Sequence, residues 1–352
     1  MTKSLKKAVS HPLFFAFACF FIVLIISVVF VPDFFTISTR GGVFSGRIIS
    51  ILDNGSTFVI LAVGMTLVVA SSGGTDISVG AVMALSASVI VALLGTGDIY
   101  NMPYVLAFII ALGVGVVCGM WNGFLVARLK IQPMIATLIL FVAGRGLAFL
   151  ATGGGRPYIT VKTFGQFGGY LPGIPFPTPI FVAIAVVFVT AMVLRFTSLG
   201  MQIQSVGINR KASRLVGVSP TKIIFICYVL CGLLAGLAGL ISASRVRSAD
   251  PTYTGINYEL DAILAVAIGG NSLGGGKFSL TGSVIGALTI QSLTTFLLAV
   301  QVSSYALPVY KGIIIIIIVV IQSPELRRFL VKLFRSKKTS FVEQQTQGGD
   351  NK

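Results

Sequence analysis

The chain has 352 residues, of which 55% are hydrophobic and only 10% are charged. A soluble domain carries about 25% charged residues, so this composition excludes a cytosolic enzyme, a nucleic-acid-binding domain and a disordered chain. The class that remains is a protein that crosses a membrane many times. Its net charge of +16 fits that class, because the lysines and arginines cluster between apolar runs, where membrane topology places them.

The first apolar run covers residues 13–31, follows three lysines and ends before Pro32 without a small-residue cleavage site. We therefore interpret it as an uncleaved span that starts in the cytoplasm. Of the later runs, all except the short run 259–270 can cross about 30 Å of hydrocarbon. The sequence predicts an all-α fold, a polytopic membrane protein with about ten transmembrane helices and both termini cytoplasmic. The predicted spans are 13–31, 51–70, 77–95, 104–126, 133–151, 178–195, 222–243, 259–270, 280–300 and 307–322.

Alternating these spans from a cytoplasmic start places most of the 26 lysines and arginines in inside segments, as the positive-inside rule requires. We expect a transmembrane domain over 1–325 and a basic, partly disordered cytoplasmic tail over 326–352. On the outside, the loop 153–177 is rich in Gly and Pro, which is typical of an ordered cap or a partner-docking surface.

The segment 73–80 carries an acid between two apolar runs. Its adjacent glycines stop a membrane helix and free backbone groups that need partners. An acid in the membrane indicates a functional site, so Asp76 is a candidate. The alternative is a plain turn in which Asp76 caps the helix that follows. A second glycine-rich segment, 269–286, has a similar pattern, which is compatible with a parallel structural repeat.

The sequence predicts no metal site and no histidine-centred catalytic site. The single histidine, His11, precedes the first span, and the four cysteines lie in apolar stretches without a matching pair nearby. The run 269–277 also fails the phosphate-loop pattern, since Asn271 stands at the required first glycine and Phe278 at the required Ser or Thr. We therefore expect no nucleotide to bind this chain.

Arg145 lies between two glycines, about 18 Å along its helix from Pro133, and so in the outer half of the membrane. A lone arginine at that depth needs a partner or a path to the interface. By depth, its candidate partners are Asp53, Glu259 and Asp261, and we expect a structural ion pair between Arg145 and Glu259. The alternative is an arginine that reaches the interface.

The cytoplasmic loop at about 197–221 contains a short amphipathic helix, predicted from about Asn209 and ended by Gly217. One face is apolar and the other is basic. Such a helix fits a groove on a partner protein; the alternative is a helix that rests on lipid headgroups. The apolar residues are Ala212, Leu215 and Val216, and the basic ones are Arg210, Lys211 and Arg214.

Three motifs in this order resemble those of the permease subunits of bacterial ABC sugar importers, the group that carries ribose, xylose, arabinose or galactose. The motifs are 64–68 with 73–80, 259–263 with 268–276, and Gly207-x-Asn209-x-x-Ala212 ending in Gly217. Segments 119–123, 130–138 and 143–146 look most like the galactofuranose-type permease. The chain departs from the usual pattern at Thr75, Ile77 and Ser213.

The resemblance implies a membrane-spanning permease subunit of an ATP-driven importer that carries a monosaccharide, such as galactofuranose or a related pentose or hexose, into the cytoplasm. It implies no catalytic residue and no cofactor on this chain, because ATP binds a separate ATPase subunit. The other implied partners are a periplasmic or extracellular sugar-binding protein, a second permease subunit that is identical or homologous, and the lipid of the bacterial inner membrane.

The resemblance also implies roles for individual residues. The candidates for the translocation path or substrate contact are Asn54, Asp76, Ser78, Asn122, Thr137 and Asp261. The candidates for coupling to the ATPase are Gly207, Asn209, Arg210, Ala212, Leu215 and Gly217. Three other functions stay open: a permease of the same type for branched-chain amino acids, nucleosides or another small solute, an ion-coupled secondary transporter, and a membrane-embedded enzyme such as a lipid transferase.

Overall fold

The computed structural model describes residues 12–322, and nearly all of its regular structure is helical, as predicted. Seven of the described helices are long and apolar enough to cross a membrane, and two shorter apolar helices, Val79–Leu94 and Leu307–Ile317, accompany them. The long helices are α2 (Pro12–Phe30), α3 (Arg47–Ser72), α5 (Tyr104–Gly123), α6 (Pro133–Ala151), α8 (Thr178–Phe196), α11 (Pro220–Val246) and α13 (Leu280–Ala299). The multi-pass helical class is therefore confirmed.

The shorter elements complete the order along the chain. α4 covers Val79–Leu94, and the predicted short span near 259–270 is the eleven-residue helix α12, Tyr258–Ile268. The remaining elements are β1 (Ser38–Arg40), β2 (Val43–Ser45), the π-helix η1 (Phe124–Arg128), the 3-10 helix η2 (Lys162–Phe164), α7 (Gly165–Gly168), α9 (Leu199–Ile208), α10 (Arg210–Leu215) and α14 (Leu307–Gln322). The antiparallel hairpin β1–β2 is a small addition to the predicted all-α fold.

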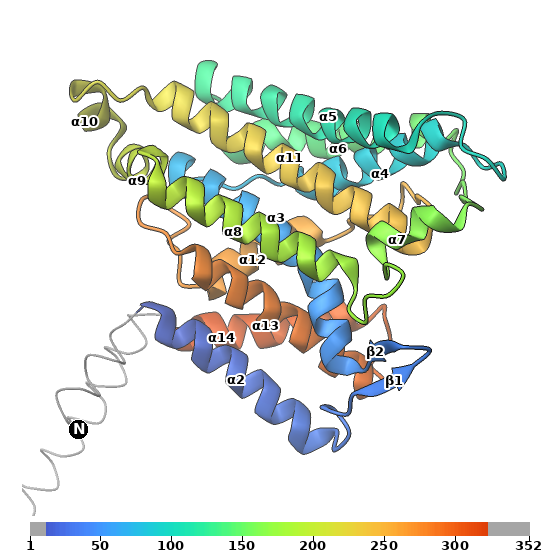
Figure 1. Ribbon diagram of the computed structural model, residues 1–352. Coiled ribbons are helices and arrows are strands. Elements are labelled where there is room, and N and C mark those ends of the chain that lie inside the picture. Colours follow the sequence, from blue (N-terminus) through green and yellow to red (C-terminus); the bar gives the residue numbers. More distant parts are fainter. Residues whose placement is uncertain (1–11, 323–352) are drawn as a thin grey trace, which may run out of the picture. The chain divides into compact units, whose positions relative to one another are not determined.

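The chain divides into two units at Gln301, and α14 belongs to the second. Within the first unit, α9 and α10 lie at one end of the helices and β1, β2 and α7 at the other (Figure 1). Loop contacts agree, since Gly276 bonds to the last turn of α3 while Phe44 bonds to Pro175. The loops thus separate into the two sets that the predicted alternation requires. The predicted tail, 326–352, lies outside the described residues.

α3 is the centre of the first unit. Every residue of its apolar window is buried, and it packs against α8, α11, α12 and α13. Several buried polar side chains of α3 bond to the helix or to a neighbour. Thr66 donates from Oγ1 to Ser283 Oγ at 2.6 Å, which ties α3 to α13.

α5 and α11 pack backbone to backbone, and glycines on both helices allow this close approach. Gly115 and Gly119 on α5 meet Gly232 and Gly236 on α11, with a spacing of four residues on each helix. A Cβ at any of these glycines would crowd atoms of the other helix. Small residues one turn apart let two membrane helices approach backbone to backbone, where dispersion contacts are densest.

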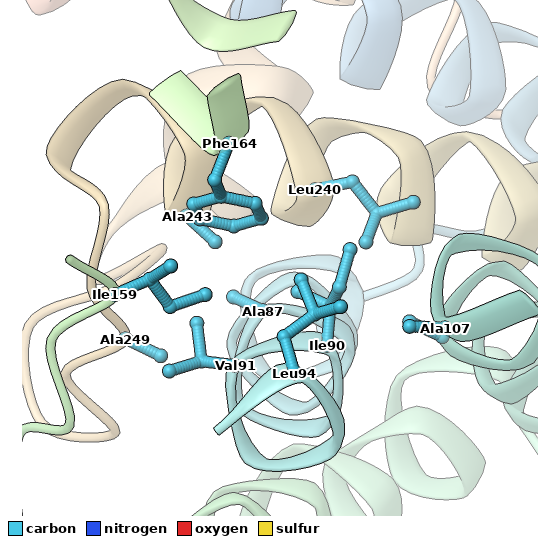
Figure 2. Packing of buried hydrophobic residues seen from close by; sticks show 11 residues of the cluster. Ala87, Ile90, Val91, Leu94, Ala107, Ile159, Phe164, Leu240, Ala243 and Ala249 are labelled. Carbon is cyan, nitrogen blue, oxygen red and sulfur yellow. The ribbon is translucent and has the colours of Figure 1, made fainter. Parts of the chain in front are cut away.

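The loop 153–177 is ordered, as expected of a cap. Phe164 and Ile159 are fully buried in an apolar cluster with α4 and α11 side chains, among them Leu94 and Leu240 (Figure 2). The backbone amide of Ile159 also donates to the carbonyl of Arg247 at 2.8 Å. This end of the unit is therefore closed by packed side chains and backbone bonds rather than by a loose loop.

Candidate functional site: a buried polar cluster and an exposed stub helix

The polar site is built where α3 stops. Gly73 adopts a left-handed conformation with φ +65° and donates its amide to the carbonyl of Val69 at 3.0 Å, which ends the helix. The chain then runs without regular structure through Asp76 and re-enters a helix at Val79. The adjacent glycines interrupt the helix, as predicted, and deliver Asp76 into the interior, where only 2% of it is exposed.

Asp76 is held by hydrogen bonds from two helices. Its Oδ1 accepts from the Ser78 amide at 2.9 Å and from Ser78 Oγ at 2.6 Å. Asn122, from α5, donates its Nδ2 to Ser78 Oγ at 2.8 Å and lies 3.4 Å from both carboxylate oxygens. Thr137, from α6, accepts the amide of Ile77 at 3.1 Å. We call Asp76, Ser78, Asn122 and Thr137 the Asp76 cluster.

The structure thus brings together four of the six residues predicted for the translocation path. All four are almost completely buried within one subunit. Asp76, Ser78 and Asn122 bond to one another, and Thr137 bonds to the amide of Ile77 between Asp76 and Ser78. Asp76 lies at the N-terminal end of α4, where the helix dipole favours a negative charge, so the capping interpretation also fits. The Oδ1 atom of Asn122 has no hydrogen-bond partner among the described residues. The cluster therefore fixes the connection between α3 and α4 against α5 and α6.

The other two path candidates lie elsewhere. Asn54 donates its Nδ2 to the carbonyl of Ser50 at 3.1 Å, near the opposite end of α3 from Asp76. Asp261 is buried in the first turn of α12 together with Glu259. Glu259 sits directly against Gly80 on α4, where a side chain larger than hydrogen would overlap its carboxylate.

The expected ion pair between Arg145 and Glu259 does not form as a direct contact. The Arg145 guanidinium instead donates to the carbonyls of Pro251 at 3.2 Å and Thr254 at 2.6 Å. The charge is therefore solvated by backbone dipoles of the loop before α12. Two salt bridges within residues 12–322 are Arg245–Asp53 and Arg156–Asp250.

The partner of Asp53 is Arg245, which we did not predict from the sequence. It lies near the end of α11 and bonds to Asp53 in α3, with its NH2 group 2.8 Å from both the carboxylate and the carbonyl of Asp53. The signal was available, because both residues fall near the outer ends of their predicted spans. The predicted span 222–243 ends two residues before Arg245, whereas α11 extends to Val246.

The short amphipathic helix predicted from about Asn209 forms as α10, Arg210–Leu215, and we call it the stub helix. Asn209 caps it, with Oδ1 accepting the amides of Lys211 and Ala212 at 3.0 Å each. Gly217 follows the helix with φ +82°. Its apolar face is bare: Leu215 is 88% and Val216 76% exposed. The preceding helix α9 was not predicted.

The match with known proteins covers most of this architecture. A family model described as "Branched-chain amino acid transport system / permease component" matches residues 47–322, from the start of α3 to the end of α14. The chain belongs to this permease family. It is a multi-pass permease of the bacterial inner membrane, and the Asp76 cluster and α10 lie within the matched region.

Similar proteins align with most of this permease. The galactofuranose transporter permease protein YtfT of Escherichia coli K12 is 42% identical over 319 residues, which cover 90% of this chain and 91% of YtfT. The fructose import permease protein FruF of Bifidobacterium longum is 37% identical over 94% and 93% of the two chains. The ribose import permease protein RbsC of Escherichia coli K12 is 39% identical over 83% and 88%. No solved structure matches the chain.

Proposed function

We propose that this permease is the membrane-spanning subunit of an ATP-driven importer that carries a monosaccharide into the cytoplasm. One observation carries the proposal: relatives that align over four fifths or more of the chain are permeases for galactofuranose, fructose and ribose. These solutes are all sugars, so the substrate class is better supported than any single sugar. The similarity to YtfT favours galactofuranose or a related pentose or hexose.

In this proposal the ATPase subunit docks on α10, and its movement reaches the permease there. A six-residue helix with Leu215 and Val216 in water gains nothing from its exposed apolar face until a partner covers it. We place that partner, a separate ATPase subunit, at the end of the helices that carries α9 and α10, and that end in the cytoplasm. The exposed residues Asn209, Ala212 and Leu215 belong to this docking surface.

The remaining partners follow from the same proposal. A second permease subunit completes the path in this proposal, because the side chains of the Asp76 cluster are buried and hydrogen-bonded within one subunit. A sugar-binding protein delivers substrate at the capped end, built from β1, β2 and the loops 152–177 and 247–257. The outer contact of this path is assigned to Asn54 and Asp261, and the inner contact to the Asp76 cluster once it opens.

Transport by the reconstituted complex tests the proposal. The tagged full-length chain is purified with its ATPase subunit, placed in liposomes with the binding protein outside, and supplied with radiolabelled D-galactose, D-fructose or D-ribose. We expect uptake of at least one sugar, dependent on ATP on the α10 side. Uptake driven by an ion gradient without ATP would overturn the proposal, and uptake of L-leucine alone would move the permease to the amino-acid branch of the family.

A further inference from the structure

The end of α3 is held by two segments that lie far from it in the sequence. A helix leaves its last four carbonyls without partners inside the helix. In α3, the carbonyl of Val69 is bonded by Gly73, the carbonyl of Ala70 accepts the amide of Gly276 at 2.9 Å, and the carbonyl of Ser72 accepts from Arg210. Two of the three bonds therefore come from the loop 269–279 and from the stub helix α10.

Glycines let these segments touch backbone to backbone. Gly207, in the last turn of α9, lies so close that a Cβ would overlap both the carbonyl of Ala70 and the amide of Gly276. Gly275, with φ +89°, lies against Gly73 in the same way. At Gly207 the backbones of the three segments are therefore in direct contact, and densely packed contacts of this kind transmit displacement.

The loop 269–279 is itself a stiff part. The side chain of Asn271 bridges its two ends, accepting the amide of Ser279 at 2.5 Å and donating to Ser283 Oγ at 2.7 Å. α3 is rigid as a buried helix, and its next four residues lead to Asp76. The junction is therefore a continuous path of hydrogen bonds and backbone contacts from α10 to the end of α3, four residues before Asp76.

We propose that Arg210 is a positioning residue inside the permease, not a contact with the ATPase, and that the junction of Ser72, Gly207 and Gly276 transmits movement of α9–α10 to the Asp76 cluster. The inference rests on the proposed function only for the claim that movement starts at an ATPase bound to α10. We call the bond from Arg210 to the carbonyl of Ser72 the clasp. The helix dipole favours a guanidinium at the C-terminus of α3, and the bond can form and break without a partner of opposite charge.

Two arginines of α10 allow a matched comparison. Arg210 reaches Ser72, whereas the exposed side chain of Arg214 makes no hydrogen bond or salt bridge to any residue of 12–322. In the reconstituted complex, Arg210→Gln should bind the ATPase within about threefold of the parent, yet transport at least tenfold less sugar per ATP hydrolysed. Arg214→Gln should keep the ratio of sugar to ATP. Arg210→Lys, which retains a cation at the helix end, should restore part of it.

A second measurement separates this inference from the proposed function, since it needs neither ATPase nor sugar. In the purified permease alone, Arg210→Gln should speed amide hydrogen exchange at least tenfold over 69–78, while Arg214→Gln leaves it unchanged. Unaltered exchange in Arg210→Gln would overturn the clasp, as would weaker ATPase binding with an intact ratio. If exchange is faster in Arg210→Gln but the permease does not use ATP, the role of the Arg210–Ser72 bond is supported and only the ATPase as the source of movement is rejected.

Discussion

Asn122 in the last turn of α5 and Ser78 at the entrance to α4 are joined by a 2.8 Å hydrogen bond that also steadies Asp76. Ser78 connects the other two residues, because its hydroxyl donates to the carboxylate of Asp76 and accepts from the side-chain amide of Asn122. Hydrogen bonds of this kind offset the cost of burying polar groups in the interior of a membrane protein. The bond therefore fixes how α4 and α5 meet.

The first prediction concerns this hydroxyl. Ser78→Ala should lower the free energy of unfolding by about 1–3 kcal/mol, because Asn122 loses its acceptor and Asp76 loses its shortest donor. Thermal unfolding in detergent measures the loss. Ser50→Ala, at an exposed position of α3, is the matched control and should change stability little. Equal melting curves for the two variants would contradict the assigned role.

The second prediction concerns the pair between Asp53 and Arg245, whose side chains are mostly buried. Arg245→Gln should destabilise the fold by about 1–3 kcal/mol, since a carboxylate stays behind without its cation. Asp53→Asn combined with Arg245→Gln should recover part of the loss, which a double-mutant cycle measures. Arg156→Gln is the comparison, because Arg156 is 63% exposed in its pair with Asp250 and should cost less than about 1 kcal/mol.

The third prediction tests the docking surface. Leu215→Glu replaces the most exposed apolar side chain of α10 and should weaken ATPase binding about 10- to 100-fold, the equivalent of about 1.5–3 kcal/mol of lost burial. Binding is measured with the purified subunits. Ile99→Glu changes an equally bare side chain in the loop at the opposite end and should leave the affinity unchanged. If Ile99→Glu is the damaging change, the two ends of the permease have been assigned to the wrong sides.

The fourth prediction concerns the cap of the stub helix. Asn209→Ala removes the acceptor for two amides and should destabilise α10 by about 1 kcal/mol, a large change for so short a helix. Asn209→Asp keeps a side-chain acceptor and should restore the helix. Amide exchange at Lys211 and Ala212 reports the cap directly. Similar protection of these amides in both variants would show that the cap does not hold the helix.

The fifth prediction concerns Arg145. Arg145→Glu should abolish stable expression, because a carboxylate would then face the carbonyls of Pro251 and Thr254 with no proton to donate. Arg145→Lys keeps a positive donor and should express. Proteolysis of the loop 250–257 should be faster in any Arg145→Ala protein that is recovered. Normal insertion and activity of Arg145→Glu would contradict the role.

Hydropathy and glycine placement were enough to predict most of the fold. Long apolar runs separated by basic loops predicted the spans, and the glycines at 73 and 74 predicted where α3 stops. The same signals placed Asp76 in the interior and α10 in its loop. These features depend on neighbouring residues in the sequence, which is why a single chain reveals them.

Pairings between distant residues were not accessible in this way. Depth alone offered Arg145 three carboxylates, whereas the structure gives it two carbonyls, and no sequence pattern marks a carbonyl as a partner. Likewise, Arg210 carries the same charge as Arg214, and only the fold turns one of them toward Ser72. Such contacts depend on how helices cross, which hydropathy does not encode.

The burial of α3 has a consequence for biogenesis. This helix is inserted early, yet two of the neighbours that cover it, α11 and α13, emerge from the ribosome much later. Until they arrive, Thr66 and the other hydroxyls of α3 face acyl chains. A nascent chain halted after α8 would therefore be an unfinished bundle vulnerable to quality-control proteases, rather than a stable half-transporter.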